Sequence, residues 1–148
     1  MIVVEIVIPH SVDRVWEELR HIDRHVTWMD DARRIDFDTS QREGVGTSFS
    51  CLTRVGPFST TDKMVITQWD DCHVMGVTHR GLVTGVGQFT LMPADGGTRL
   101  TWSESLHFPW WLAGALGAFL AKPLLTIVWR KNLSNLARVL SATTPGAK

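Results

Sequence analysis

Two polar residues in the second half of the chain have side chains suited to acid–base chemistry. Glu104 lies in an alternating stretch, residues 98–106, in which one face would carry Leu100, Trp102, Glu104 and Leu106. The same parity turns His79 of an earlier strand toward that face. A carboxylate beside an imidazole in an apolar cavity can relay a proton during an aldol cyclisation or a dehydration. The pattern indicates Glu104 and His79 as catalytic candidates, with Asp62 and His107 as further polar candidates.

A structural role for Glu104 stays open. Its carboxylate could pair with an arginine such as Arg80, or it could lie at the rim of a pocket. No further pattern supplies a nucleophile, since Ser-His-Asp and Cys-His sites are recognised by a geometry that sequence does not reveal.

The elements that would position these side chains are mostly strands. A β-branched run at residues 2–8 ends at Pro9, and Ser11 then caps a short amphipathic helix whose buried face carries Val12, Val15, Trp16 and Leu19. A helical turn is expected at 23–29. Turn residues separate the later strands, and alternation predicts residues 46–54, 58–69, 72–79, 83–92 and 98–106 as an antiparallel meander.

The last third of the chain is apolar and lacks acidic residues. A stripe of large side chains predicts a helix packed on the sheet, formed by Leu125, Trp129, Leu133, Leu136 and Leu140. Gly114, Gly117 and Pro123 weaken its first part, so a break or kink is expected near residues 121–122. Residues 110–120 would then form a flexible apolar lid, or a kinked helix whose exposed face meets a second subunit or a membrane surface.

Composition restricts the classes of function. The 148 residues suit a single domain, expected over 1–141, with a flexible tail at 142–148. The formal charge is zero, but residues after Glu104 carry +5 and the preceding residues −5. A neutral chain without a dense basic patch argues against nucleic-acid binding. Lys122 and Pro123 divide the apolar segment 110–129, which favours a buried helix over a membrane span.

Metal and cofactor motifs are weak. His21 and His25 have helical spacing but no third ligand, so we expect a surface pair and no metal. The two Gly-Val-Gly stretches at 44–46 and 85–87 lack the context of a nucleotide loop; we expect them to bend strands, and no cofactor is predicted. Cys51 and Cys72 fall in expected strands without paired spacing, which favours a reduced, cytoplasmic protein. Eleven arginines against four lysines suggest a bacterial source.

The order of these motifs resembles a known superfamily. The residues that carry the resemblance are the first strand with residues 9–16, the hairpin at 96–102 and the final helix with residues 132–136. This pattern over residues 2–140 is similar to the START-like (SRPBCC) superfamily, which includes polyketide cyclases, pollen allergens and lipid-transfer domains. The resemblance implies an α+β helix-grip fold: a seven-stranded antiparallel sheet curved around the last helix, with two short helices between strands one and two.

This fold implies an apolar pocket, and the expected parity predicts its lining. The ligand-binding residues we expect are Trp28, Phe49, Cys51, Met64, Ile66, Met75, Val77, His79, Phe89, Leu91, Trp102, Glu104, Leu116, Phe119, Leu120 and Leu124. The leading hypothesis is a carrier or sensor that binds a lipid, polyketide, aromatic or quinone-like molecule. The alternatives are a cyclase or aromatase using Glu104 and His79, and an interaction module that docks through its apolar, cationic last helix. Peripheral membrane contact and a homodimer are the further partner hypotheses.

Overall fold

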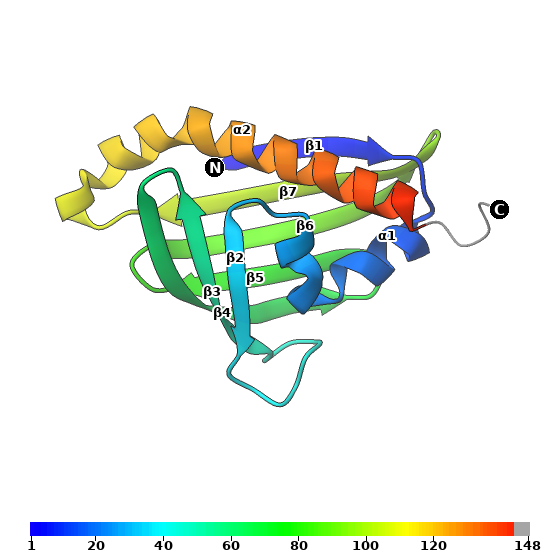
Figure 1. The fold of residues 1–148 in the computed structure, drawn as a ribbon, viewed down its shortest axis with the longest axis horizontal. Coiled ribbons are helices and arrows are strands. Elements are labelled where there is room, and N and C mark those ends of the chain that lie inside the picture. Colours follow the sequence, from blue (N-terminus) through cyan, green and yellow to red (C-terminus); the bar gives the residue numbers. More distant parts are fainter. Residues whose placement is uncertain (144–148) are drawn as a thin grey trace.

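The computed structural model describes residues 1–143, except the side chains of Leu112, Ala115, Leu116 and Ala118. A seven-stranded antiparallel sheet has the order β1-β7-β6-β5-β4-β3-β2 and curves beneath the long helix α2 (Figure 1). The elements along the chain are β1 (Ile2–Ile8), α1 (Val12–Leu19), η1 (Ile22–Thr27), β2 (Ala32–Phe37), β3 (Ser48–Val55), β4 (Phe58–Asp70), β5 (Val74–Arg80), β6 (Thr84–Ala94), β7 (Gly97–His107), η2 (Trp110–Leu112) and α2 (Gly114–Ala142). This is the predicted helix-grip fold.

The strand faces follow the predicted parity. In β7, Leu100, Trp102 and Glu104 are buried while the intervening residues are less so. Cross-strand register places Trp102 opposite Phe89 and Leu100 opposite Leu91, so the inward side chains of β6 and β7 meet on the concave face. The expected inward residues of β3, β4 and β5 lie on the same face, and Phe49, Cys51, Ile66 and Met75 are buried there.

The chain between β1 and β2 covers one end of the concave face. The Ser11 hydroxyl accepts a hydrogen bond from the Arg14 backbone N–H at 3.3 Å, which caps α1 as expected. Val15, Trp16 and Leu19 are buried, and η1 follows close to the predicted helical turn.

Helix α2 lies alongside β1 (Figure 1). Of the predicted stripe, it buries Trp129, Leu133, Leu136 and Leu140, while Leu125 is partly buried. Of the break or kink predicted near residues 121–122, the break is wrong, because α2 continues through Pro123 without interruption. The Pro123 ring is exposed, and the carbonyl oxygen of Lys122 accepts a hydrogen bond from the Thr126 hydroxyl at 2.7 Å. The helix axis bends along this part instead, which is how long helices accommodate proline. The proposed tail at 142–148 lies almost wholly outside the described residues.

Two asparagines join α2 to the loop before β2. The Asp30 N–H donates to Asn132 Oδ1 at 2.9 Å, and Asn132 Nδ2 donates to Asp31 Oδ1 at 2.7 Å. One turn later, Asn135 Nδ2 donates to the Trp28 carbonyl oxygen at 3.1 Å. Buried amides that satisfy backbone groups fix the position of a helix more specifically than apolar contacts do.

Two further sequence predictions need correction. Cys72 lies in the turn between β4 and β5, where its φ of 67° is incompatible with a strand. His25 is buried, with Nε2 2.7 Å from the Leu19 carbonyl oxygen, so it does not form a surface pair with His21. Its ring also contacts Trp28 and Phe89. Among the described residues, no group of three or more His, Cys, Asp and Glu side chains is arranged to hold a metal.

Burial of His25 predicts a loss of stability in acid. Burial lowers the pKa of His25 from 6.5 to about 4, opposed by the hydrogen bond to Leu19. As the pH falls, His25 binds a proton in the unfolded protein before it does so in the folded protein. The stability that neutral, buried His25 contributes is therefore complete above pH 6.5 and is lost as the pH falls to 4. We expect this group alone to lower the free energy of unfolding by about 3 kcal/mol across that interval in urea denaturation series.

The control for this prediction is His21, which lies on the same segment and is partly exposed. His21→Gln should keep the acid-dependent loss, whereas His25→Gln should flatten the profile between pH 4 and 6.5. Parallel profiles for the His25→Gln variant and the unmodified protein would contradict the assignment.

Candidate functional site

A cavity of about 690 Å³ lies between the concave face of the sheet, η1 and the first half of α2. Its walls are mainly apolar and come from β2 to β7, η1 and α2. Several side chains that line it are also well exposed, which places them at its mouth. These rim residues are Phe58 at the start of β4, Leu82 in the turn after β5, and Leu120 and Leu124 from α2.

The structure brings most of the predicted ligand-binding residues together on this cavity. Those that line it are Phe49, Cys51, Met64, Ile66, Met75, Val77, His79, Phe89, Trp102, Glu104, Leu120 and Leu124. Trp102 and Trp129 stack in its wall with ring centroids 5.0 Å apart. Whether these residues contact a ligand stays a prediction.

Four predicted residues are placed elsewhere or not described. Trp28 and Leu91 are fully buried in the core and do not line the cavity. Phe119 is 72% exposed and points to the outer face of α2. Leu116 lies in α2, but its side chain is outside the part of the chain that the structure describes. The helical phase accounts for Phe119, because residues 117, 120, 121 and 124 face the cavity.

The two catalytic candidates meet inside the cavity. Nε2 of His79 lies 3.6 Å from Oε1 of Glu104, and both side chains are about nine-tenths buried. The same oxygen accepts a hydrogen bond from the Trp102 indole N–H at 3.1 Å. His79 Nε2 has no hydrogen-bond partner among the described residues. Arg80, the alternative partner for Glu104, is exposed, and no ion pair between the two is present among the described side chains.

A glycine between the two strands makes this meeting sterically possible. His79 is on β5 and Glu104 is on β7, with β6 between them. Gly87 of β6 is directly opposite Glu104, and a Cβ atom at Gly87 would lie only 2.8 Å from Glu104 Oε1. The Gly-Val-Gly sequence at 85–87 therefore does more than bend a strand, because Gly87 leaves the space that the Glu104 side chain occupies.

Two more carboxylates reach the cavity. Asp62 on β4 is buried, and its Oδ1 accepts hydrogen bonds from the Leu82 N–H at 2.9 Å and from the Thr60 hydroxyl at 3.4 Å. A Cβ atom at Gly81 would lie 2.1 Å from that oxygen, so glycine is needed there as well. Asp62 was a secondary candidate in the sequence; the other one, His107, is exposed at the end of β7.

Asp31 is the third carboxylate, and sequence reasoning missed it. It lies in a polar stretch typical of a surface turn, and only its bond to Asn132 shows that it faces inward. Burial raises the pKa of Asp31, the Asn132 hydrogen bond opposes this, and the negative charge of Glu104 adds to the increase. Burial likewise raises the pKa of the Cys51 thiol, with further increases from Asp31 and Asp62.

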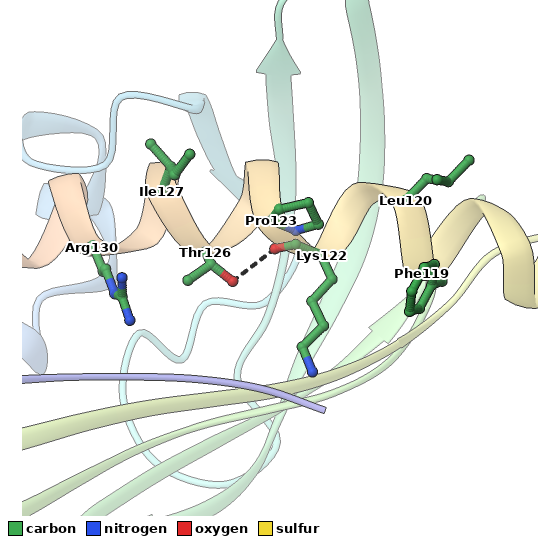
Figure 2. Close-up of a pocket in the computed structure, with 7 residues that line it drawn as sticks. All are labelled: Phe119, Leu120, Lys122, Pro123, Thr126, Ile127 and Arg130. Atoms are coloured by element: carbon green, nitrogen blue, oxygen red, sulfur yellow. Dashed lines mark hydrogen bonds between the residues drawn. The ribbon is translucent and has the colours of Figure 1, made fainter.

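The outer face of α2 carries a separate apolar groove (Figure 2). Its walls are Phe119, Leu120, Lys122, Pro123, Thr126, Ile127 and Arg130. Phe119 and Ile127 are mostly exposed, as are Trp110 and Trp111 just before the helix. Within residues 1–143, no helix has the length and apolar character that crossing a membrane requires.

Comparisons with known proteins agree on the fold. TTHA0849 from Thermus thermophilus has a TM-score of 0.77 at 19% identity, over 97% of this chain and 99% of that chain. The di-domain ARO/CYC StfQ from the steffimycin biosynthetic pathway has a TM-score of 0.77 at 12% identity, over 95% of this chain and 50% of that one. Ara h 8.0201 has a TM-score of 0.68 at 13% identity, over 95% and 97%. No curated protein matches the sequence.

At these identities the solved structures establish the fold and nothing more. The sequence itself carries the family assignment, because the family model described as polyketide cyclase / dehydrase and lipid transport matches residues 1–141, which is nearly the whole chain. The chain therefore belongs to the polyketide cyclase/dehydrase and lipid transport family.

Proposed function

We propose that the protein binds a hydrophobic small molecule inside its cavity and acts as a carrier or sensor. The observation that carries this proposal is the cavity of about 690 Å³ with predominantly apolar walls. A ligand would gain about 25 cal/mol for each Å² of apolar surface that leaves water, and a few polar groups would orient it. The chain belongs to a family whose description includes lipid transport, which supports this function. The ligand types we propose are a lipid, a polyketide and an aromatic or quinone-like molecule.

Filling part of the cavity should weaken binding. Val77 lines the cavity from β5, while Val86 on β6 is exposed on the other side of the sheet. We expect Val77→Trp to weaken binding of the fluorescent apolar probe N-phenyl-1-naphthylamine by about tenfold or more, because the indole occupies the space for the probe. Val86→Trp is the matched control and should bind the probe as the unmodified protein does. Equal binding by both variants would place the probe outside the cavity; urea denaturation checks that each variant is folded.

A second candidate function is cyclisation or dehydration of a polyketide. The observation that favours it is the buried pair of Glu104 and His79, with His79 Nε2 unpartnered among the described residues. The Glu104 carboxylate would remove a proton from a carbon between two carbonyl groups. His79 would donate a proton to the oxygen of the carbonyl that the resulting carbanion attacks.

Removing the Glu104 carboxylate tests this chemistry. If the pair transfers protons, Glu104→Gln should lower the turnover of a poly-β-ketone substrate by about 10²- to 10⁴-fold, because the amide cannot accept the proton. Glu5→Gln, at a half-exposed glutamate of β1, is the control. Product formation followed by chromatography gives the rate. Unchanged turnover in Glu104→Gln would remove this residue from the mechanism.

The exposed face of α2 favours contact with an anionic membrane surface as a third function. Phe119, Leu120 and Ile127 are exposed beside Lys122 and Arg130, and no acidic residue follows Glu104 in the sequence (Figure 2). Aromatic and aliphatic side chains flanked by cations are the combination that interfacial helices use on anionic lipids. Leu120 also lines the cavity mouth, so docking there would bring the opening to the lipid.

Vesicle sedimentation tests the membrane contact. We expect binding to phosphatidylglycerol vesicles, weaker binding to phosphatidylcholine vesicles, and about tenfold weaker binding to phosphatidylglycerol for Phe119→Glu, because a charge enters the apolar face. Met92→Glu is the control, since Met92 is similarly exposed on β6 away from α2. Concentration-dependent self-association without vesicle binding would instead identify a homodimer. Capture of another protein without vesicle binding would identify an interaction module.

A further inference from the structure

Apart from two histidines, the described ionisable side chains that line the cavity are acidic. Three carboxylates line it, from Asp31, Asp62 and Glu104, and no lysine or arginine is among the described lining residues. The chain has fifteen of these cations, and none that the structure describes is buried. The two histidines at the cavity are His25 and His79, and burial lowers the pKa of His25 to about 4, so that ring is neutral at pH 7.

The hydrogen bonds of the three carboxylates come from uncharged donors, apart from the contact with His79. Asp31 receives the Asn132 amide, Asp62 receives the Leu82 N–H and the Thr60 hydroxyl, and Glu104 receives the Trp102 indole. The second oxygens of Asp62 and Glu104 accept no hydrogen bond from another described residue. Each of these two carboxylates therefore retains the capacity to accept a hydrogen bond inside the cavity.

An anionic ligand would meet unfavourable electrostatics in this space. Its charge would leave water for an apolar cavity, where Coulomb interactions are stronger, and would find three carboxylates and no fixed lysine or arginine among the described lining residues. A neutral ligand with hydroxyl or phenol groups would instead donate hydrogen bonds to the open carboxylate oxygens.

We propose that the cavity selects an apolar ligand whose polar groups are hydrogen-bond donors without negative charge, such as a phenol or an alcohol, and discriminates against fatty acids and other organic anions. This inference rests on the proposed binding function and adds the chemistry of its ligand. The selecting residues are Asp62 and Glu104, from β4 and β7, with Asp31 adding to the negative potential.

A pair of fluorescent probes with nearly the same apolar body tests the selection. N-Phenyl-1-naphthylamine is neutral, and 8-anilinonaphthalene-1-sulfonate adds one sulfonate charge to that body. We expect the neutral probe to bind about tenfold more tightly or better at pH 7 in low salt. In displacement experiments with the neutral probe, 1-dodecanol should compete and dodecanoate should not. Dodecylamine, which is a cation at pH 7, shows whether the cavity requires only a hydrogen-bond donor or prefers a positive charge.

Isosteric neutralisation of the carboxylates supplies the decisive comparison. Asp62→Asn and Glu104→Gln should each raise the affinity ratio of the anionic probe to the neutral probe by several fold, because each removes one negative charge from the cavity. Asp95→Asn, at an exposed aspartate between β6 and β7, is the control and should leave the ratio unchanged. If the neutral probe binds but the affinity ratio of the two probes is near one, or does not change in either variant, the selection is refuted and the binding function stands. If neither probe binds, the binding function fails and the selection fails with it.

Discussion

The packing of the second half of α2 against the sheet is the contact on which the rest of the structure depends. A strongly curved sheet has a concave apolar face that must be covered, and the stripe from Trp129 to Leu140 fills one end of it. The asparagines at 132 and 135 then fix the helix to the loop before β2. The first half of α2 leaves space at the other end of the concave face, where Leu120, Leu124 and the sheet line a cavity.

Two glycines leave the space that polar side chains occupy in that cavity. Gly87 and Gly81 let the carboxylates of Glu104 and Asp62 lie against bare backbone at distances that a Cβ atom would forbid. Asp31 is held differently, by an amide from α2. The three carboxylates thus come from β4, β7 and the loop before β2, and each is held by a contact between segments that are distant in sequence. The charge of the site is therefore a property of the fold rather than of any single motif.

Periodicity predicted the strands, the last helix and most of the residues that line the cavity, whereas the resemblance to a known superfamily implied the seven-stranded helix-grip arrangement. The alternation in β7 and the stripe in α2 each have one correct phase, and an error of one residue would bury polar side chains. Contacts between distant segments are not accessible in this way. Asp31 and Asn132 are about a hundred positions apart, and neither neighbourhood suggests burial. The errors have physical causes as well. The Pro123 ring faces solvent, and the helix accommodates it by bending. The chain around His25 forms the tighter turn of η1, which the α-helical spacing of His21 and His25 does not indicate.

The stacked rings of Trp102 and Trp129 also give the protein an optical property. The sequence contains seven tryptophans and no tyrosine, so its near-ultraviolet absorption and emission come almost entirely from indole. Two of these indoles stack at 5.0 Å in the wall of the cavity, where a bound molecule would change their surroundings directly. The emission spectrum and near-ultraviolet circular dichroism are therefore intrinsic reporters of cavity occupancy, which need no label and no knowledge of the ligand.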